Sequence, residues 1–117
     1  MDTRVKAVIN MLHQSVEKQL SVCILSKSVN LSPTRLRQLF KQETGRSPLQ
    51  YLRDVRMHRA EHLLRTTFLT IKEIASLIGV GDVSHFARDF QQQFGFTPRE
   101  YRTQHSIAHP NLISADE

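Results

Sequence analysis

Two stretches of the sequence are alike: LFKQETGRSPLQY, which begins at Leu39, and DFQQQFGFTPREY, which begins at Asp89. A Phe, a Gly, a Ser/Thr–Pro pair and a Tyr recur in both with the same spacing, at an offset of 50 positions (89 − 39). Gly is typical of a helix end, and Pro after Ser or Thr is typical of a helix start. The chain therefore contains one small helical module twice.

Upstream of each stretch the similarity continues at an offset of 49 positions (75 − 26), which relates Ser26 to Ala75 and Asn30 to Gly79. The first pair are small residues suited to a close contact between helices. The second pair are residue types that tolerate left-handed backbone. A short helix, a tight turn and a more polar second helix make a helix-turn-helix, whose second helix enters the major groove of DNA.

Apolar residues recur at helical spacing along most of the chain, without the alternation of a β-strand. This periodicity predicts an all-α fold of seven helices. The apolar stripes run over Val5–Val16, Val22–Val29, Leu36–Phe40, Leu52–Leu64, Ile71–Ile78 and Phe86–Phe94, and a short seventh helix follows Pro98.

Helix boundaries are marked by local capping signals. A Ser or Thr followed three residues later by Gln or Glu predicts a reciprocal capping box. This pattern occurs in SPLQ at Ser47, TIKE at Thr70 and TPRE at Thr97. Gly45 and Gly95 are expected to end helices in a left-handed turn, and Ser32 and Asp82 to cap the starts of the third and sixth helices.

The charge is unevenly distributed. The formal net charge is +5, with 39% hydrophobic and 23% charged residues, as expected for a globular protein. Residues 32–66 carry eight basic and three acidic side chains, whereas residues 67–117 carry four basic and six acidic ones. A concentrated positive potential favours a polyanionic partner such as nucleic acid, and it surrounds the first copy of the module.

Membrane and disulfide signals are absent from the sequence. No apolar run approaches the roughly 20 residues of a membrane span, and the N-terminus lacks the apolar core of a signal peptide. We therefore predict a cytoplasmic protein with no membrane partner. Cys23 is the only cysteine, which excludes an internal disulfide. Because it lies in an apolar stretch, we expect a buried structural thiol.

The string LSPTRLRQLFKQETGRSPLQYLRDVRMHRAEHLL, followed by TIKEIASLIGVGDVSHFARDFQQQFGFTPREYR, resembles the DNA-binding domain of AraC-type bacterial transcription regulators. The resemblance covers about residues 5–103. It implies a first helix-turn-helix subdomain at 1–46, a linker helix at 47–66 and a second subdomain at 67–105. Residues 106–117 are expected to form a disordered tail.

The resemblance implies sequence-specific binding of double-stranded DNA, without a cofactor. A linker helix from Pro48 to Arg65 would be ~27 Å long. Successive major-groove faces lie roughly 34 Å apart. One chain of this kind is therefore expected to read two adjacent groove segments.

The resemblance also implies which residues contact DNA. Base-reading positions fall on Thr34, Arg37 and Gln38 in the first copy and on Val83, Ser84, His85 and Arg88 in the second. Arg suits guanine, Gln suits adenine, and the Thr methyl can pack on the thymine methyl. Phosphate contacts are expected from Ser32, Arg35, Lys41, Arg46 and Ser47, the last two because a helix N-terminus presents free N–H groups.

The second copy departs from the family pattern. Gln91 and Gln92 stand where Lys is frequent, Val80 replaces a usual Phe, and Asp89 adds a negative charge. We therefore predict that the first copy supplies most of the affinity for DNA. On the linker, the resemblance implies that Arg56 bridges the two subdomains, with a carboxylate such as that of Asp54 or Glu73 as its partner.

The string HRAEH, from His58 to His62, fits the H-x-x-E-H pattern of inverted zinc metalloproteases. Two His four residues apart lie on the same side of a helix and could share a metal. However, Ala60 belongs to the apolar face of the linker helix, and no third ligand is evident. We interpret the string as a chance match and predict no enzyme activity and no metal site.

The alternative function is a protein-interaction adaptor that contacts RNA polymerase or another regulator. Family members often contact RNA polymerase, so such contacts could coexist with DNA binding. They usually carry a separate ligand-sensing or dimerisation domain as well. None is evident in this sequence, so we expect either an excised DNA-binding domain or a small stand-alone regulator.

Overall fold

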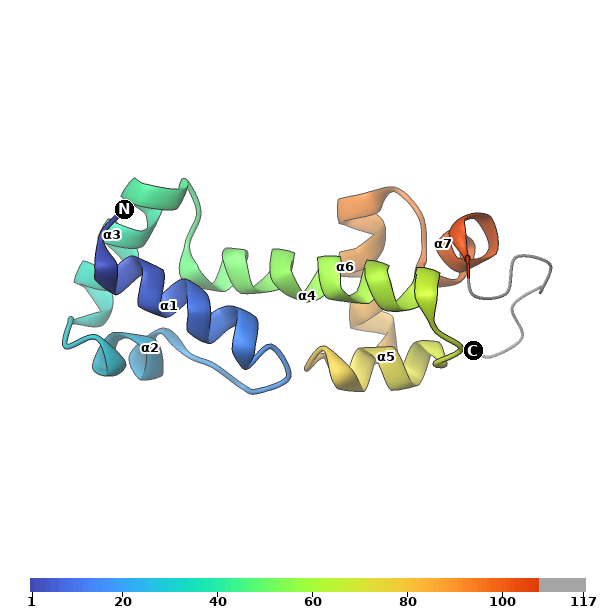
Figure 1. Cartoon of the computed structure of the whole chain (residues 1–117), viewed down its shortest axis with the longest axis horizontal. Coiled ribbons are helices and arrows are strands. Elements are labelled where there is room, and N and C mark those ends of the chain that lie inside the picture. Colours follow the sequence, from blue (N-terminus) through green and yellow to red (C-terminus); the bar gives the residue numbers. More distant parts are fainter. Residues whose placement is uncertain (108–117) are drawn as a thin grey trace. The chain divides into compact units, whose positions relative to one another are not determined.

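The computed structural model describes residues 1–107 and shows an all-α protein, as the sequence predicts (Figure 1). Over these residues there are seven helices and no strand. The helices are α1 (Thr3–Gln14), α2 (Val22–Ser28), α3 (Pro33–Thr44), α4 (Pro48–Thr66), α5 (Ile71–Leu77), α6 (Val83–Phe94) and α7 (Pro98–His105).

The chain divides into two compact units, Met1–Val55 and a second unit from Arg56 onward. The boundary lies within α4, which is one uninterrupted helix of 19 residues. Of the predicted tail, Ser106 caps α7 and the Ile107 N–H donates to the Arg65 carbonyl at 2.9 Å. Residues 108–117 lie outside the described part of the chain.

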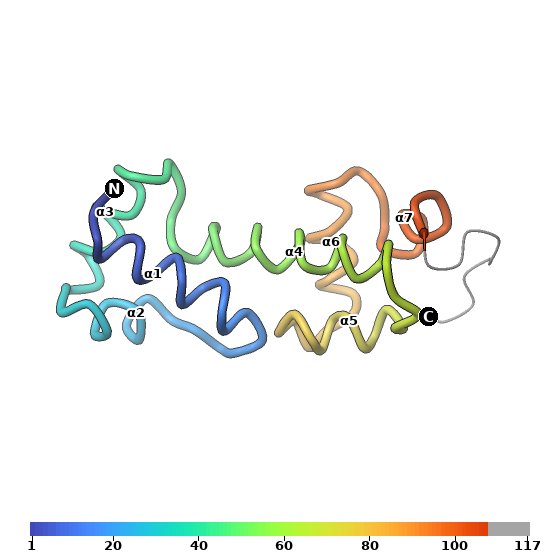
Figure 2. The backbone as a smooth tube through the Cα atoms, in the orientation of Figure 1, coloured from blue at the N-terminus to red at the C-terminus, as the bar shows by residue number. Residues whose placement is uncertain are grey.

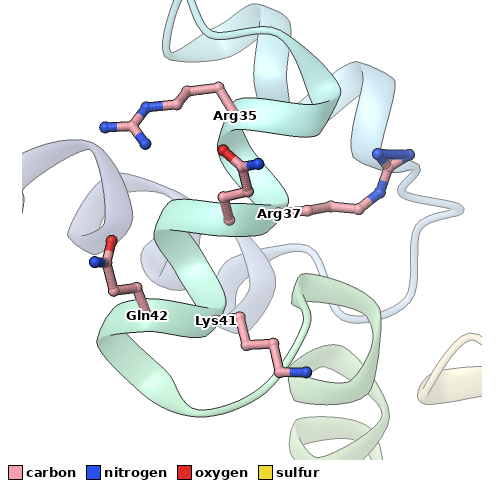
Figure 3. A pocket seen from close by; sticks show the side chains of 5 residues that line it. Arg35, Arg37, Lys41 and Gln42 are labelled. Carbon is pink, nitrogen blue, oxygen red and sulfur yellow. The ribbon is translucent and has the colours of Figure 1, made fainter.

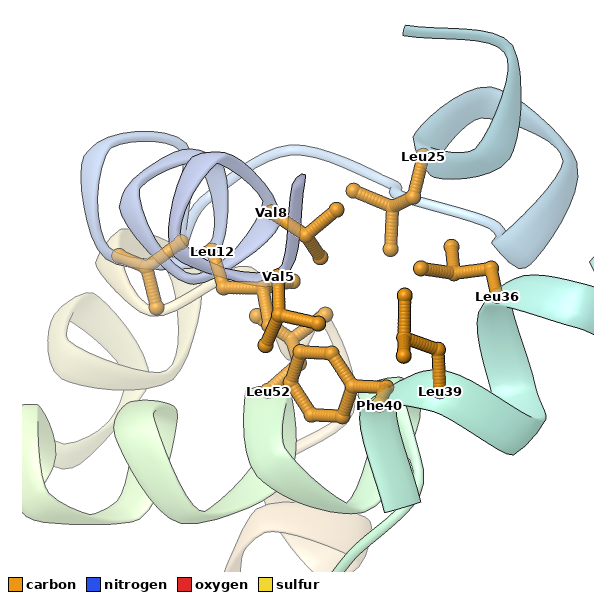
Figure 4. Close-up of a cluster of buried hydrophobic side chains, with 9 residues drawn as sticks. Val5, Val8, Leu12, Leu25, Leu36, Leu39, Phe40 and Leu52 are labelled. Carbon is orange, nitrogen blue, oxygen red and sulfur yellow. The ribbon is translucent and has the colours of Figure 1, made fainter. Parts of the chain in front are cut away.

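The first unit has its own hydrophobic core (Figure 4). The apolar stripe predicted for the first helix is buried, and α2, α3 and the first half of α4 close around it. Phe40 is completely buried and meets the ring of Tyr51 edge-on, at 5.5 Å between centroids. The fully or nearly fully buried residues are Val5, Val8, Leu12, Val16, Leu25, Leu36, Leu39, Phe40 and Leu52.

The second unit has a separate core, built by the second half of α4 together with α5 and α6. Phe90 is fully buried and lies among three rings, with centroids 5.9 Å from Phe86, 4.6 Å from Phe94 and 5.4 Å from Tyr101. The buried residues are Met57, Ala60, Leu64, Ile71, Ile74, Ala75, Ile78, Phe86 and Phe90. Met57, which lies within the predicted stripe Leu52–Leu64, exposes only 1% of its surface.

The turn of each helix-turn-helix has the same backbone geometry. Asn30 (φ 58°) and Gly79 (φ 82°) adopt the left-handed conformation that the repeat predicts. Leu31 N–H donates to the Ser26 carbonyl and Val80 N–H to the Ala75 carbonyl, each at 2.9 Å. This six-to-one bond is the Schellman motif that ends helices. Figure 2 shows the backbone turning sharply between α5 and α6 at the second of these turns.

The small residues that precede these turns are buried. Ser26 and Ala75 each expose only 1% of their surface. The Ser26 hydroxyl donates to the Cys23 carbonyl at 3.0 Å, so its polar group is satisfied within α2. A larger side chain would separate the two helices of the unit, which is why the repeat keeps a small residue here.

The predicted helix caps are confirmed. Ser47 and Gln50 bond reciprocally, with the Ser47 N–H 3.0 Å from Gln50 Oε1 and the Gln50 N–H 3.2 Å from Ser47 Oγ. Thr70 and Thr97 form capping boxes with Glu73 and Glu100. Side chains cap four further helix starts, at Asp2, Ser21, Ser32 and Asp82. Gly45 and Gly95 end α3 and α6 at φ 80° and 81°.

One prediction about the first unit is wrong. Cys23 is exposed, not buried. On α2 the buried side chains are Leu25 and Ser26, and a residue two positions before Leu25 points to a different face of the helix. The apolar residues around Cys23 therefore do not enclose it.

Candidate nucleic-acid interface

The polar side chains of α3 lie on its exposed faces, opposite the buried Leu36 and Phe40. The predicted residues Thr34, Arg35, Arg37, Gln38 and Lys41 are all exposed. Four of them, together with Gln42, line an open depression of about 560 Å³ on the first unit. Figure 3 shows Arg37 and Lys41 extending to one side of the helix and Arg35 and Gln42 to the other.

The cations of α3 are not engaged with acidic side chains. Within residues 1–107, Arg35, Arg37 and Lys41 make no side-chain hydrogen bond or ion pair. Three positive groups on adjacent helical turns produce a local positive potential, and their donors are available to an anionic or hydrogen-bonding ligand. The start of α3 adds the partial positive charge of a helix N-terminus.

The predicted phosphate contacts Ser32 and Ser47 both act as helix caps. The Ser32 hydroxyl accepts from the Arg35 N–H at 3.1 Å, and Ser47 is bonded to Gln50. Each hydroxyl still has its own proton to donate, so capping is compatible with a phosphate contact. The contact itself stays a prediction.

Arg46 has an acidic neighbour that the sequence analysis did not foresee. Its Nε lies 2.7 Å from Oδ2 of Asp54, and its Nη2 lies 3.4 Å from Oδ1. The Arg46 side chain remains 52% exposed. An exposed pair of this kind contributes about 0–1 kcal/mol, so it orients the guanidinium at the start of α4 without withdrawing it from solvent.

The candidate base-reading residues of α6 are also exposed, in the second unit. Val83, Ser84, His85 and Arg88 are exposed, whereas Phe86 and Phe90 are fully buried. The Asp82 carboxylate caps the helix by accepting from the Ser84 N–H at 2.8 Å and the His85 N–H at 3.4 Å. These candidates therefore occupy the first turns of α6, as those of α3 occupy its first turns.

Asp89 makes a side-chain contact with His85 on α6 that the sequence analysis did not identify. Its Oδ2 lies 3.1 Å from Nε2 of His85. The His85 side chain is 55% exposed and that of Asp89 is 17% exposed. The spacing of four residues was a usable signal, because such residues are neighbours on a helix surface.

Arg56 is half-buried in α4, and desolvation lowers its pKa. Of its two expected partners, Asp54 binds Arg46 and Glu73 closes the capping box of α5. The proposed bridging role of Arg56 stays a prediction.

The residues of the HRAEH string have structural contacts. Glu61 accepts hydrogen bonds from the Tyr101 hydroxyl and from Arg65 Nε, the latter at 2.7 Å. The His58 ring meets the Phe94 ring edge-on, with centroids 5.6 Å apart. In the part of the chain that the structure describes, no group of three or more His, Cys, Asp and Glu side chains could hold a metal ion.

Burial and hydrogen bonding shift the pKa values of Glu61 and Tyr101 in opposite directions. Burial alone would raise the pKa of Glu61, but the hydrogen bonds from Tyr101 and Arg65 outweigh it, so the pKa lies below its usual range. Burial and the bond to Glu61 raise the pKa of Tyr101 to about 12. The pair joins α4 to α7 inside the second unit and holds it together.

A buried arginine is a further contact that the sequence analysis missed. Arg102 exposes 2% of its surface, and its Nε donates to the Leu64 carbonyl at 3.3 Å. It therefore ties α7 to the end of α4. No helix within residues 1–107 is both long and apolar enough to cross a membrane.

Comparison with known proteins relates this geometry to transcription regulators. A family model described as "Helix-turn-helix domain" matches residues 25–104. The HTH-type transcriptional activator RhaS of Enterobacter sp. (strain 638) is 34% identical over 101 residues, which cover 86% of this chain and 36% of RhaS. The lactose operon transcription activator of Staphylococcus xylosus is 32% identical over 103 residues, which cover 88% of this chain and 37% of the activator. The chain thus spans little more than a third of the length of these relatives.

Solved structures of regulator domains are also similar to this chain. The C-terminal domain of AraT, a response regulator from Geobacillus stearothermophilus, superposes with a TM-score of 0.88 at 27% identity, covering 97% of this chain and 95% of that domain. The DNA-binding domain of AdpA, solved in complex with a target DNA, superposes with a TM-score of 0.85 at 25% identity, covering 93% of this chain and 98% of that domain.

Proposed function

The chain belongs to the AraC-type helix-turn-helix family of transcription regulators, and from this premise we propose that it binds specific sequences of double-stranded DNA through α3 and α6. The observation that supports this most strongly is the surface of α3. Its three cations are exposed and, within residues 1–107, engaged with no acidic partner, although the helix is firmly packed on its opposite face. A rigid helix with available donors is what major-groove recognition requires.

In the first unit we propose that Thr34, Arg37 and Gln38 read bases. They occupy the first half of α3, and in this class of motif the N-terminal residues of the recognition helix contact base edges. Arg37 would donate two hydrogen bonds to a guanine, and Gln38 would pair with an adenine. The Thr34 methyl would pack on a thymine methyl.

Phosphates are proposed to be held by a set of groups around these base contacts. Arg35 and Lys41 would neutralise phosphate charge, and Arg46 would do so from the start of α4. Ser32 and Ser47 would donate hydroxyl protons beside the backbone N–H groups of two helix starts. Such contacts fix the position of the protein on DNA without carrying sequence information.

In the second unit we propose that Val83, Ser84, His85 and Arg88 read a second block of bases. Arg88 is the strongest candidate for a guanine contact, because it is an exposed Arg with no side-chain partner among the described residues. One chain would then read two blocks about 10 bp apart, as in successive turns of the major groove.

Control of transcription is the wider role that we propose. The RhaS and lactose operon relatives are named as activators. For the whole regulator, we propose contact with RNA polymerase and a separate domain for ligand sensing or dimerisation. A protein adaptor that does not bind DNA is the competing function, and specific DNA affinity distinguishes the two.

The test is selection of bound sequences from random DNA duplexes, with the salt dependence of binding measured on the selected duplex. We expect an asymmetric site with two short blocks about 10 bp apart, and an affinity that falls as salt rises. Lys41→Ala should weaken binding to every sequence and lower the salt slope by about one charge. Lys6→Ala, which removes an equal charge from α1, is the matched control and should change neither. Failure to select any sequence would contradict the proposal.

A further inference from the structure

The contact between the His85 imidazole and the Asp89 carboxylate is a difference between the two recognition helices. At an offset of 50, His85 corresponds to Arg35 and Asp89 to Leu39. Leu39 is 7% exposed and belongs to the core of the first unit. The second unit therefore places a carboxylate, 17% exposed, where the first has a buried apolar side chain.

A carboxylate at this place is unfavourable for a simple DNA-binding surface. It adds a repulsive charge on a helix that has to approach phosphates, and it gives up the apolar contact that Leu39 makes. Its described partner is the His85 imidazole, at 3.1 Å. The carboxylate therefore has a specific effect on one side chain that is itself a candidate base reader.

The contact between Asp89 and Nε2 of His85 determines which hydrogen bonds the other ring nitrogen, Nδ1, can make. A carboxylate oxygen can only accept a hydrogen bond, so Nε2 carries a proton whether the ring is neutral or charged. Nδ1 is then the nitrogen whose role changes. It accepts a hydrogen bond on the neutral ring and donates one on the imidazolium.

We infer that Asp89 is a positioning residue that sets base specificity in the second unit, by fixing the tautomer of His85 so that Nδ1 is the atom offered to DNA. The inference rests on the proposed DNA-binding function. With a neutral ring, an Nδ1 acceptor favours the amino group of adenine or cytosine. With a charged ring, an Nδ1 donor favours guanine. The base preference of this block therefore depends on pH. That of the first block does not, because its proposed base readers, Thr34, Arg37 and Gln38, include no histidine.

Among the described residues, no other charged side chain forms a hydrogen bond or ion pair with the His85 imidazole. Within the described residues its hydrogen-bonded or ion-paired side-chain partner is Asp89 alone. On α6 itself, the Asp82 carboxylate bonds backbone N–H groups and Arg88 is exposed. The remaining charged or titratable residues of the helices that pack on α6 are Arg56, His58, Arg59, Glu61, His62 and Arg65 on the second half of α4, Lys72 and Glu73 on α5, and Arg99, Glu100, Tyr101, Arg102 and His105 on α7.

The experiment is selection from random duplexes at about pH 5.5 and about pH 8, on either side of the range in which an ordinary imidazole titrates. For the full chain, one position of the second block should change from adenine or cytosine to guanine as pH falls, with a change of about fivefold to tenfold in relative affinity. The first block provides the internal control and should stay the same.

Two substitutions of Asp89 separate tautomer control from folding. Asp89→Leu installs the residue of the first unit, and Asp89→Asn keeps the size but can bond either ring nitrogen. At about pH 8 both variants should lose the preference for adenine or cytosine, by about fivefold. At about pH 5.5 both should keep the preference for guanine, because the charged ring donates from both nitrogens. A merely structural role of Asp89 would weaken both preferences equally.

Each other outcome counts against the inference. In His85→Gln the base selected at this position should no longer change with pH, whatever the affinity of the variant for DNA. A change of base that persists in this variant would assign the change to another group. A wild-type second block that is the same at both pH values, or an Asp89→Asn protein that behaves as wild type, would overturn the inference while leaving DNA binding intact. Selection of no sequence at either pH would overturn the proposed function itself.

Discussion

The turn between α2 and α3 and the turn between α5 and α6 are closed by the same backbone hydrogen bonds, yet the helices that follow them carry different charges. Each second helix ends at a Gly with φ near 80° and begins at a side-chain cap. On α3 there are three cations and one acid, whereas on α6 there is one of each and a histidine. The repeated backbone thus coexists with a surface that has diverged.

The cores of the two units also differ in kind. Among the described residues, Phe40 has a ring contact with Tyr51 and is otherwise packed against aliphatic side chains. Phe90 lies within a cluster of aromatic rings that extends to α7. The second unit is further tied by Glu61, which accepts from Tyr101. Similar backbones are therefore stabilised by different interactions, and matched substitutions can measure the difference.

The largest effect is expected from truncating the two equivalent phenylalanines. Phe40→Ala and Phe90→Ala should each lower the free energy of unfolding by about 3–5 kcal/mol, because both rings are fully buried. Phe90→Ala should cost about 1 kcal/mol more, since it also loses aromatic pairs. Urea denaturation followed by circular dichroism measures both. A larger loss for Phe40→Ala would mean that the aromatic cluster adds nothing beyond its buried area.

The next effect tests whether the first unit dominates binding. Arg37→Ala should weaken specific DNA binding by about 1–3 kcal/mol, and by more than Arg88→Ala, because α3 carries the greater positive charge. Titration of the selected duplex at one fixed salt concentration gives both dissociation constants. The reverse order would refute the asymmetry between the two units.

A smaller effect, equal in both units, is expected at the glycines that end α3 and α6. Gly45→Ala and Gly95→Ala should each destabilise the protein by about 1–2 kcal/mol through the left-handed backbone conformation. An added Cβ meets no atom within 4 Å at either position, so no steric clash contributes. Thermal unfolding of the two variants and the wild type measures the loss of stability at each position. Unequal losses would show that the two turns are not energetically equivalent.

The smallest effect concerns Tyr101, with its equivalent Tyr51 as the control. The pKa of Tyr101 is raised to about 12, so the folded state favours the protonated phenol. This stabilisation is complete below the ordinary tyrosine pKa near 10 and is lost as pH rises from about 10 to about 12. Tyr101→Phe should cost about 1 kcal/mol at neutral pH and reduce the alkaline loss of stability.

Urea denaturation at about pH 8 and about pH 11 measures this change. Tyr51 has ring contacts with Phe40 and His13 but no carboxylate partner for its hydroxyl within residues 1–107. Tyr51→Phe should therefore retain the wild-type pH dependence. An unchanged alkaline loss in Tyr101→Phe would show that the Glu61 bond does not contribute to it.

Local chemistry explains what the sequence could predict. Helix starts at Ser47, Thr70 and Thr97 depend on residues three positions apart, and the left-handed turns depend on the residue type at Asn30 and Gly79. The buried face of α3 follows from helical spacing. These features need no knowledge of which helices meet, so the pattern of residues is sufficient.

The sequence could not predict the contacts between residues that are far apart along the chain. Arg102 meets the carbonyl of Leu64, and Tyr101 meets Glu61, across 38 and 40 positions of sequence. Nothing in either local pattern marks these partners. Cys23 is a different failure, because the helical phase of Leu25 already places it outside the core. The candidate DNA-binding residues of α3 and α6 are exposed, as helical spacing predicts. Their contacts with DNA stay a prediction, because exposure shows only that these side chains are accessible.

The boundary between the units falls between Val55 and Arg56, in the interior of an unbroken helix. A helix end leaves about four N–H or four C=O groups without an intrahelical partner. Severing the polypeptide there would create two new frayed ends, neither with a capping residue selected for it. Proteolysis or gene truncation at this boundary should therefore yield poor stand-alone fragments, and an engineer who wishes to exchange one half should transplant the whole of α4.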